Sequence, residues 1–406
     1  MDTTKQLEII KRGAVEIMNE AALIEKLEKK KQLVVKSGFD PTAPDIHLGH
    51  TVLLRKLRHF QDLGHKVIFL IGDATALVGD PTGQNQARKV LTKEEIEKNA
   101  KTYEKQVGKI LKTGDKELFE RMHNSAWFAK FGFEHLVQLA QRYTVARLLE
   151  RDDFQKRLKE GKPISFLELF YPLMQGYDSV ILDADVEIGG TDQKFNMLVG
   201  RDLQEAYGKE PQVVITMPLL VGTDGVQKMS KSYCNYIGIN ESAKEIFGKV
   251  MSISDETMFS YYELLTDEDM QKVRGMHPMD AKKNLAYLIV KDYHGEEEAA
   301  SEKKNFEDVF QKRKDPSDAP VKKLSGGPLS LNQVFDSARE EFKAMGIDSR
   351  SKLLSLLGQG AIKLDGEKLS DATIPSFGPG KRHLLKIGRH FLNIDLSQGK
   401  NNLKKA

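Results

Sequence analysis

The chain has 406 residues and a mass of 45.8 kDa, enough for two or three ordinary domains. Lysine and arginine number 62 against 59 aspartates and glutamates, so the formal net charge is only +3. With a charged fraction of 30% and a mean hydropathy of -0.45, the composition excludes fibrous, collagen-like and wholly disordered proteins. No run approaches the roughly 20 apolar residues of a membrane-spanning helix, so we expect neither an integral membrane protein nor a membrane partner.

The N-terminal residues and the cysteine content indicate the cellular compartment. Residues 1–20 carry charges every few positions and lack the apolar core of a signal peptide, so we expect a cytoplasmic protein. Cys234 is the single cysteine, which excludes a disulfide within the chain and a multi-cysteine zinc or iron–sulfur site. A pI of about 8.5 neither demands nor excludes an RNA partner.

Apolar periodicity predicts alternating strands and helices in the first half of the chain. A strand at 32–39 is followed by a helix at 48–63 and by a continuous apolar strand at 66–71. Further elements are predicted as strands at 125–128, 185–188 and 212–217 and as helices at 93–111 and 191–207. This alternation predicts an α/β fold with a Rossmann-like doubly wound parallel sheet, whose ligands bind in the loops after the strands.

Composition shifts divide the chain into segments. Residues 1–240 are predicted to form the sheet domain, with a helix-rich insertion at about 113–182 that covers the site or forms a dimer contact. Residues 241–312 show a helical pattern, and the Pro-, Gly- and Ser-rich residues 313–330 predict a linker. Residues 331–406 are predicted to form a small α+β domain. Its short strands are expected near 361–364 and 384–394.

Two histidines flank a glycine at the start of the helix predicted at 48–63. The segment reads His47-Leu48-Gly49-His50. Imidazole N–H groups and a helix N-terminus both donate to anions, and at Gly49 a flat ring such as adenine can approach the backbone. The alternative is that His47 caps the helix and His50 lies on the surface.

A second polar loop follows the strand predicted at 212–217. It contains Lys228-Met229-Ser230-Lys231-Ser232. Lysines are compact charges on flexible stems, suited to a phosphate whose charge shifts during a reaction. The alternative is a solvated basic loop, but two such loops at the ends of one sheet together favour a phosphate site.

Polar residues recur at helical spacing in the apolar segment 166–182. Tyr171, Gln175 and Asp178 lie at positions i, i+4 and i+7, on one face of a helix. Three polar groups that point together from an apolar segment indicate a ligand pocket. The alternative is a surface helix with its polar stripe in water.

The paired segments 47–50 and 228–232 resemble the signature motifs of class I aminoacyl-tRNA synthetases, and the surrounding residues resemble the bacterial tyrosyl-tRNA synthetases. The resemblance covers nearly the whole chain. The supporting segments follow the order of that family at residues 38–43, 79–83, 171–178 and 188–193.

The resemblance implies a reaction in two steps. The carboxylate of L-tyrosine attacks the α-phosphorus of ATP, and the activated tyrosyl group then passes to the 3′ end of tRNA(Tyr). Neither step needs a protein nucleophile, since in-line transfer is catalysed by positioning and by cations. Mg²⁺ is expected to arrive with ATP, and we expect no tightly bound cofactor and no protein-held metal.

The resemblance also assigns residues to ligands. The catalytic set around the phosphates comprises Thr42, His47, His50, Lys228 and Lys231. The other ATP-binding residues are Asp40, Gly49, Arg88, Gly190, Asp192, Met229, Ser230 and Ser232. The tyrosine-binding set comprises Lys36, Asp80, Tyr171, Gln175, Asp178 and Gln193. Asp178 is assigned to the phenolic hydroxyl, and phenylalanine would leave this carboxylate unpaired.

Two positions depart from the better-known branch of the family. Lys36 stands where that branch has a tyrosine whose hydroxyl reaches the substrate phenol. We therefore hypothesise that Lys36 pairs with Asp178 or donates to the phenol. Gln84 stands where a lysine is common, which leaves Arg88 and Lys89 to supply positive charge.

Residues 349–367 resemble an S4 RNA-binding fold. Leu354 and Ser355 stand where such domains usually carry two arginines. Because phosphate binding needs cations, RNA contact is assigned to other basic residues, namely Arg350, Lys352, Lys363, Lys381, Arg382, Lys386 and Arg389. The alternative is a solvated charged face on a small domain.

Three other interpretations remain open. A tryptophanyl enzyme shares the motifs, although Asp178 argues against it because an indole offers only an N–H donor. A non-catalytic RNA-binding relative would keep the fold as a scaffold, and a small-molecule nucleotidyltransferase would leave the S4-like segment unexplained. The resemblance further implies a homodimer that forms through residues 120–165.

Overall fold

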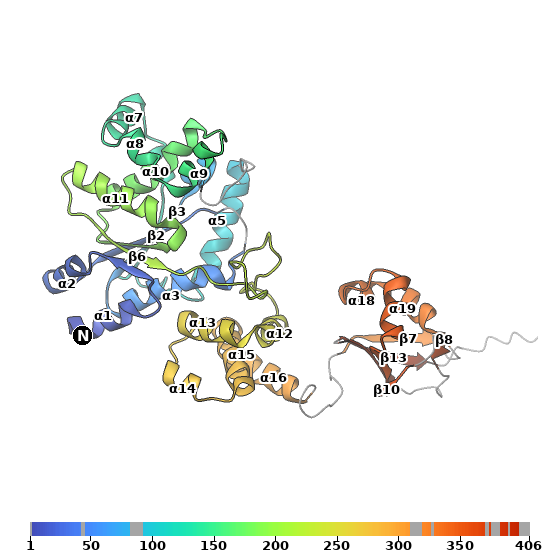
Figure 1. Cartoon of the computed structure of the whole chain (residues 1–406). Helices are drawn as coiled ribbons and strands as arrows, with labels where there is room; N and C mark the ends of the chain where they lie inside the picture. Colours follow the sequence, from blue (N-terminus) through green and yellow to red (C-terminus); the bar gives the residue numbers. More distant parts are fainter. Residues whose placement is uncertain are drawn as a thin grey trace, which may run out of the picture. The chain divides into compact units, whose positions relative to one another are not determined.

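The computed structural model describes residues 2–41, 45–81, 92–308, 319–325, 329–369, 373–374, 382–388 and 390–397. The chain forms two compact units, Met1–Glu302 and Lys303–Ala406 (Figure 1). None of the helices in the described residues combines the length and the hydrophobicity needed to span a bilayer.

The first unit is built around a six-stranded sheet with the strand order β1-β6-β5-β2-β3-β4. The strands are β1 (Glu16–Met18), β2 (Val34–Phe39), β3 (Lys66–Ile71), β4 (Phe119–His123), β5 (Val186–Gly190) and β6 (Val213–Met217). All neighbours pair in parallel except β1, which joins β6 antiparallel. The predicted α/β fold with a doubly wound parallel sheet is confirmed, and β1 adds an edge strand that the periodicity did not predict.

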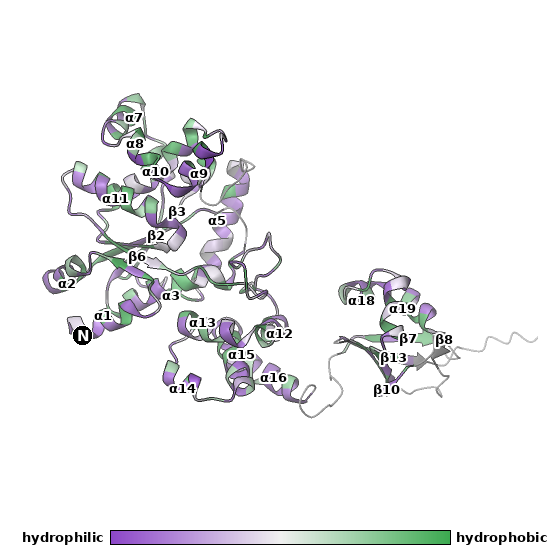
Figure 2. Cartoon of the chain, in the orientation of Figure 1, coloured by the Kyte–Doolittle hydropathy of each residue, from purple (hydrophilic) through white to green (hydrophobic). Residues whose placement is uncertain are grey.

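Helices cover both faces of this sheet. Strands β5 and β6 are buried at every position and β3 at all but the first, as expected when both faces are covered. Helices α10 (Phe166–Leu182) and α11 (Lys194–Ala206) lie on one face and α3 (Leu48–Asp62) lies on the other (Figure 1). The ribbons of these helices change between hydrophobic and hydrophilic colours, the pattern of helices that bury one side (Figure 2).

The strand predicted at 125–128 is wrong. These residues form the short helix α6 (Ser125–Phe128), and the edge strand is β4, whose sequence FERMH contains mostly polar residues. A four-residue apolar run has the same pattern in a strand and in a buried helical turn. The carboxylate of Asp73 decides the outcome, because its Oδ1 accepts from the Ser125 backbone N–H at 2.9 Å at the start of the helix.

A run of helices connects β4 to β5. It comprises α6, α7 (Phe133–Ala140), α8 (Val145–Leu148), α9 (Asp152–Lys159) and α10. The other helices of the sheet domain are α1 (Thr3–Lys11), α2 (Glu20–Lys29), α4 (Asp73–Val78), α5 (Lys93–Val107) and the 3-10 turn η1 (Thr191–Gln193). Because β4 falls inside the range predicted for the insertion, the insertion begins after this edge strand.

A helical region follows the sheet domain, and its last helix crosses the boundary between the two units at Glu302. Its helices are α12 (Ala243–Ser252), α13 (Asp255–Leu265), α14 (Met270–Arg274), α15 (Pro278–His294) and α16 (Glu296–Phe306). Side-chain caps begin several of them, as where Ser242 and Glu245 form a capping box. Arg55 of α3 ion-pairs with Asp267 and Asp292, at 3.0 and 2.9 Å, which ties this region to the sheet domain.

The second unit has its own sheet and core. A five-stranded sheet has the order β10-β9-β12-β13-β7, and a separate pair joins β11 to β8. The elements are β7 (Val321–Ser325), β8 (Leu329–Ser330), α17 (Leu331–Ser337), α18 (Arg339–Ala344), α19 (Arg350–Gly358), β9 (Ile362–Leu364), β10 (Glu367–Lys368), β11 (Thr373–Ile374), β12 (Arg382–Ile387) and β13 (His390–Ser397). The core packs Phe335 and Phe342 against Leu385 and Leu392. This is the predicted small α+β domain.

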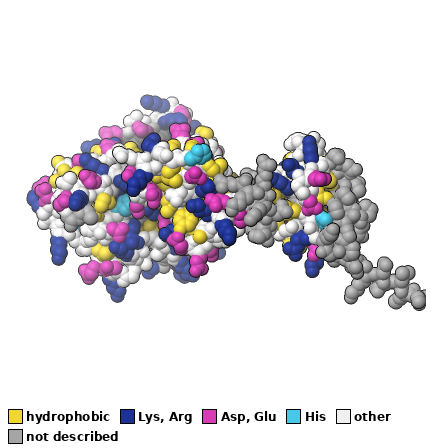
Figure 3. All heavy atoms as spheres, turned by 90° about the horizontal axis from the view of Figure 1, so that it is seen from below, with side chains coloured by type: hydrophobic (Ala, Val, Ile, Leu, Met, Phe, Trp, Pro, Cys, Tyr) yellow, Lys and Arg dark blue, Asp and Glu magenta, His cyan; other side chains and the backbone are white. Residues whose placement is uncertain are grey.

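Part of the predicted linker belongs to this second sheet. Residues 321–325 form β7, which pairs in parallel with β13. Leu324 enters the core while the flanking lysines stay outside, and the composition of the segment conceals this alternation. Across the face of the molecule seen in Figure 3, Lys and Arg side chains are interspersed with Asp and Glu, consistent with the small net charge.

Two glycines bring α10 close to α11. A Cβ atom on Gly176 would lie 2.9 Å from Leu203 Cδ1 and 3.1 Å from the Gly200 backbone nitrogen. No side chain fits between the helices at this point, so the position of α10, which carries Tyr171, Gln175 and Asp178, depends on this contact.

We predict opposite effects for the same substitution at two helical glycines. Gly176→Ala should lower the free energy of unfolding by about 1–3 kcal/mol, because the new methyl overpacks the α10–α11 contact. Gly248→Ala, on the exposed side of α12 where a Cβ meets nothing within 4 Å, should raise it by about 0.5–1 kcal/mol. Urea unfolding of both variants measures these changes. Equal effects at the two sites would contradict the close contact.

Candidate active site

The two histidines cap the helix that they begin. His47 is the N-cap of α3, and its Nδ1 accepts from the Gly49 backbone N–H at 3.1 Å. The Nδ1 of His50 accepts from the His47 backbone N–H at 3.2 Å, and the ring centroids lie 3.9 Å apart. Because each Nδ1 is an acceptor, each Nε2 carries the proton and is a donor.

Both imidazoles are held neutral. Burial lowers the pKa of His47 to about 2, with the nearby His50 and Lys231 as further causes. Burial, followed by Lys231, lowers the pKa of His50 to about 4. The pair therefore offers two uncharged Nε2–H donors to a ligand at neutral pH.

The loop with Lys228 and Lys231 is held by one amide side chain. Asn235 is 3% exposed. Its Oδ1 accepts from the Ser230 backbone N–H at 2.8 Å, and its Nδ2 donates to the Lys228 carbonyl at 3.2 Å and to Asp224 Oδ2 at 2.8 Å. Asp224 in turn accepts from two backbone N–H groups of the loop. A Cβ on Gly222 would lie 2.2 Å from the Asn235 amide nitrogen, so only glycine fits beside it.

The fold brings the two predicted loops together. The Leu48 backbone N–H, at the first residue of α3, donates to the Ile237 carbonyl at 2.9 Å. Lys231 Nζ lies 3.7 Å from Asp45. A Cβ on Gly49 would lie 2.9 Å from the His47 ring and 3.6 Å from Met229 Cβ, so a side chain at position 49 would collide with the His47 ring.

Strand β5 ends beside the same loops. Lys228 Nζ lies 3.5 Å from Asp192 Oδ2 in η1. A Cβ on Gly190 would lie 2.6 Å from Asp192 Oδ1. The residues predicted to bind ATP from the loops after β2, β5 and β6 are therefore neighbours at the carboxyl ends of the strands, as the topology requires.

The buried carboxyl of Asp178 lies on the opposite side of the sheet from α3. Its Oδ1 accepts from Trp127 Nε1 at 2.9 Å and its Oδ2 from Asn124 Nδ2 at 3.3 Å. Burial raises the pKa of Asp178 to about 7, while Lys36 opposes this increase. Each carboxylate oxygen retains a second acceptor site for a ligand hydroxyl.

The other predicted pocket residues form two linked groups. The Tyr171 hydroxyl and the Thr75 hydroxyl each donate to Asp40 at 2.8 Å. Burial, followed by the charge of Asp40, raises the pKa of Tyr171 far above its ordinary value. In the second group Gln193 Nε2 donates to Asp80 Oδ2 at 2.7 Å, and the buried Arg151 lies 3.5 Å from the same carboxylate.

Lys36 makes a different ion pair from the one predicted. Its Nζ lies 3.2 Å from Glu187 Oε1 and donates to the Gln175 carbonyl at 3.1 Å, and within the described residues it has no ion pair with Asp178. Lys36 and Glu187 are direct neighbours across β2 and β5. The register of the two strands therefore selects the partner of Lys36, and this register is not visible in the local sequence around either residue.

Two groups of predicted residues are not part of the geometry described above. Thr42, Gln84, Arg88, Lys89, Lys381 and Arg389 fall outside the described residues. The remaining RNA-assigned residues belong to the second unit, namely Arg350, Lys352, Lys363, Arg382 and Lys386. Among the described residues no group of three or more His, Cys, Asp or Glu side chains is arranged to hold a metal ion.

Sequence reasoning missed several residues that build the site. Glu187 carried a signal, because it is a carboxylate inside an otherwise apolar strand. Trp127, the single tryptophan, was concealed in the segment misassigned as a strand. Asn124 and Arg151 carried no recognisable signal, since their contacts come from segments distant in the sequence. Asn235 contacts residues 5 to 11 positions earlier in its own loop, and an asparagine in a polar loop carried no recognisable signal either.

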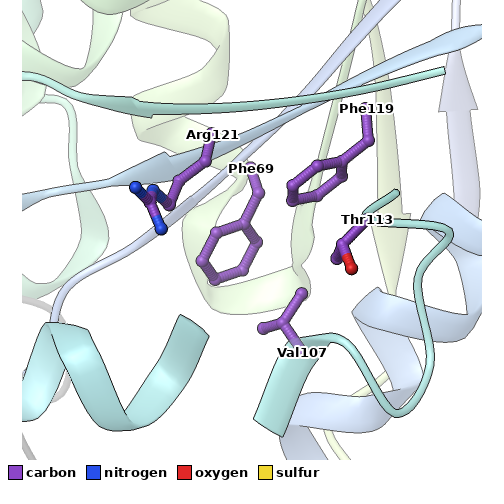
Figure 4. A pocket seen from close by; sticks show the side chains of 5 residues that line it. All are labelled: Phe69, Val107, Thr113, Phe119 and Arg121. Atoms are coloured by element: carbon purple, nitrogen blue, oxygen red, sulfur yellow. The ribbon is translucent and has the colours of Figure 1, made fainter. Parts of the chain in front are cut away.

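A cavity of about 350 Å³ lies elsewhere on the sheet, lined by Phe69, Val107, Thr113, Phe119 and Arg121 (Figure 4). Phe69 and Phe119 lie on the face that β3 and β4 share with the end of α5, whereas Ile68, Leu70 and Met122 pack with Trp127 on the Asp178 side. The cavity therefore lies on the other face of the sheet from Asp178.

We predict that stability falls as the pH is lowered through the histidine range. Folding lowers the pKa values of His47, His50 and His65 from 6.5 to about 2, 4 and 4. Below pH 6.5 the unfolded chain therefore binds up to three more protons at these groups than the folded chain does. The raised pKa of Asp178 means that the folded chain binds one more. The free energy of unfolding should therefore fall by up to about 2.7 kcal/mol per pH unit between about pH 6 and 4.5.

Urea unfolding at several pH values measures this slope. His65→Gln keeps an acceptor for the Leu33 N–H and should reduce the slope by one proton. A stability that stays constant over this range would contradict neutral, buried histidines.

Known proteins resemble this chain over nearly its whole length. It is 52% identical over 375 residues to the tyrosine–tRNA ligase of Aquifex aeolicus, an alignment that covers 91% of this chain and 93% of that protein. It is also 52% identical over 391 residues to the tyrosine–tRNA ligase of Francisella tularensis, which covers 94% and 96%.

Solved structures share the fold of the first unit. A C-terminally truncated mitochondrial tyrosyl-tRNA synthetase from Aspergillus nidulans matches with a TM-score of 0.63 and 23% identity, over 76% of this chain and 94% of that one. The tyrosyl-tRNA synthetase of Archaeoglobus fulgidus matches with a TM-score of 0.60 and 24% identity, over 74% and 100%. Residues 28–311 match the model of the family tRNA synthetases class I (W and Y). With that match and with relatives half identical to it, this chain belongs to the class I tRNA synthetases of the W and Y group.

Proposed function

We propose that this chain activates L-tyrosine with ATP, releasing pyrophosphate, and transfers the tyrosyl group to tRNA(Tyr). Relatives about half identical to it are named tyrosine–tRNA ligases. The observation that carries the choice of amino acid is the buried carboxyl of Asp178, held by Trp127 and Asn124. This carboxyl accepts a phenolic hydroxyl, and a phenylalanine ring would leave it desolvated and unpaired.

Positioning and charge supply the catalysis of activation. His47 and His50 present neutral Nε2–H donors at the start of α3, which with the helix N-terminus suit the ATP phosphates. Lys228 and Lys231 stand on the neighbouring loop and follow the departing pyrophosphate. Gly49 and Met229 leave room for the adenine, and Gly190 with Asp192 suits the ribose.

The amino group of tyrosine fits the other end of the pocket. Asp80, Tyr171 and Gln175 supply oxygen acceptors for an ammonium group, and Gln193 holds Asp80 in place. The Tyr171 hydroxyl donates its proton to Asp40, so the lone pairs of its oxygen are left to accept from the ammonium group. Neither step needs a protein nucleophile, because the substrate carboxylate itself attacks ATP.

We assign Mg²⁺ to the ATP substrate rather than to a protein site, since the phosphates supply the oxygen ligands that this ion prefers. Activity lost on chelation and restored by Mg²⁺ checks this assignment. The cytoplasm is the compartment where charged tRNA is used, and recovery of the protein in a membrane or secreted fraction would contradict that placement.

Exposed apolar side chains on the helices after β4 support the proposal of a homodimer. Phe133 is 80% exposed, Val145 55% and Phe166 71%. Large apolar side chains gathered on one segment mark an interface, and this segment overlaps residues 120–165. A mass of one chain in sedimentation analysis would contradict the dimer.

The second unit offers cations for tRNA on its sheet. Lys363 of β9 lies directly opposite Lys386 of β12 and Lys368 of β10. Like charges in such a row repel one another, and a polyanion relieves the repulsion. Arg350 is less available, because it is ion-paired with Asp336.

The first experiment measures pyrophosphate exchange into ATP with each of the twenty amino acids. We expect exchange with tyrosine alone, because the pocket is built around a hydroxyl acceptor. Tryptophan-dependent exchange would place the chain in the other branch of the family. No exchange with any amino acid would favour a non-catalytic RNA-binding relative.

We predict that the lysine row carries part of the tRNA affinity. Lys363→Ala/Lys386→Ala should weaken tRNA binding and reduce the slope of log K against log salt by about 0.7–0.9 for each phosphate that the variant no longer neutralises. Tyrosine-dependent exchange should be unchanged. Lys343→Ala, exposed at the end of α18, is the matched control, and an equal weakening in that variant would contradict a specific row.

A further inference from the structure

A buried ion pair lies beneath the proposed tyrosine pocket. The side chains of Lys36 and Glu187 are 1% and 2% exposed, and Lys36 Nζ lies 3.2 Å from Glu187 Oε1. They are register partners on β2 and β5, so both project from the same face of the sheet toward α10. Burying two charges is costly unless every acceptor is satisfied, so the pair calls for a reason beyond stability.

Both oxygens of the Glu187 carboxylate have two donors each. Its Oε1 accepts from Gln175 Nε2 at 3.1 Å, in addition to Lys36. Its Oε2 accepts from Ser179 Oγ at 3.1 Å and from Gln212 Nε2. Four donors converge on a single carboxylate, so Glu187 is held in one position and in turn holds the groups that donate to it.

One of these donors is a proposed ligand of the substrate. Because the amide nitrogen of Gln175 donates to Glu187, the amide oxygen is the atom of that group available to accept from an ammonium. An amide rotated the other way would present its N–H groups to the positive charge. Glu187 thereby selects the useful orientation of Gln175.

Glu187 also controls where the positive charge of Lys36 resides. Lys36 lowers and Glu187 raises the pKa of Asp178, so both charges act on this carboxyl although neither forms an ion pair with it. The groups that face Asp178 are Lys36 from β2, Glu187 from β5, Trp127 from α6, Asn124 and the neighbouring Tyr171. With its counter-ion in place, Lys36 leaves the outer acceptor sites of Asp178 to the ligand.

We propose that Glu187 is a positioning residue for tyrosine recognition: it turns the Gln175 amide oxygen toward the substrate ammonium and keeps Lys36 away from Asp178, the acceptor of the substrate hydroxyl. This assignment rests on the proposed function. Lys36 and Glu187 then act as one unit. Replacing both charged side chains by neutral ones should disturb the site less than replacing either one alone.

The test compares Glu187→Gln, Lys36→Met and the double variant in tyrosine-dependent pyrophosphate exchange. Each single variant should raise the KM for tyrosine by about ten-fold or more, because a buried charge is left without its partner, and leave the KM for ATP unchanged. Phenylalanine rejection should weaken in parallel. The double variant should have a KM for tyrosine within about three-fold of that of the unsubstituted chain. Independent effects would instead multiply the two single increases.

The pH profile of kcat/KM for tyrosine distinguishes positioning from general damage. Glu187→Gln should move the apparent pKa of the limb assigned to Asp178 downward, because a negative neighbour is removed. Lys36→Met should move it upward, and the double variant should restore it. If Glu187 only stabilised the fold, the two single substitutions would not move this apparent pKa in opposite directions.

Asp185→Asn is the matched control. Asp185 is a buried carboxylate that immediately precedes β5 and pairs with the buried Lys26 at 3.3 Å, but it contacts no proposed ligand residue. Its substitution should lower the melting temperature and leave the tyrosine KM unchanged. Circular dichroism of all variants separates unfolding from altered recognition.

Two results would overturn the assignment in distinguishable ways. If the unsubstituted chain is active and the single variants keep its KM for tyrosine, Glu187 has no positioning role. The same conclusion follows if the two single effects multiply in the double variant. In both cases the proposed function itself still stands. An absence of tyrosine-dependent exchange in the unsubstituted chain would remove the proposed function itself, and the role of Glu187 with it.

Discussion

The position of β2 between β5 and β3 is the constraint on which the site depends. From β2 the chain builds outward through β3 and β4, and it then returns to place β5 and β6 on the other side. The loops that follow β2 and β5 therefore separate at this point and leave a crevice at the carboxyl ends of the strands. His47 and Asp192 enter from its two sides, and the loop with Lys228 and Lys231 closes it through contacts before α3.

Different kinds of hydrogen-bond donor line the proposed nucleotide site in this crevice. The imidazoles are buried, neutral and fixed by backbone hydrogen bonds at their Nδ1 atoms. The lysine side chains are long and flexible, and Asn235 and Asp224 fix the backbone of their loop. Rigid donors suit a phosphate that stays in place, and mobile cations suit a pyrophosphate that leaves.

At the proposed amino-acid end of the crevice the charged groups are buried and held by one another, in contrast to the flexible lysines. Here Lys36, Glu187 and Asp178 lie in a region with little water, where each charge influences its neighbours strongly. Trp127 and Asn124 hold Asp178, and Glu187 holds Lys36 and Gln175. The apolar core of the sheet thus encloses a polar network whose hydrogen bonds define the shape and the orientation of the pocket. The Gly176 contact with α11 places the helix that carries Gln175 and Asp178 of this network.

The sequence by itself predicted four of the six strands of the first sheet, β2, β3, β5 and β6, and with them α3, α5, α11, the two loops proposed to bind the nucleotide and the polar face of α10, because these depend on local periodicity and on motifs that span only a few residues. It also contained the family resemblance. Tertiary structure alone decided that Lys36 pairs with Glu187, that 125–128 is helical beside Asp73, and that 321–325 completes a sheet. Trp127 likewise acquired its role only from the fold. The reason is physical: strand register and side-chain capping join residues distant along the chain, and no local pattern records which partner will be nearest.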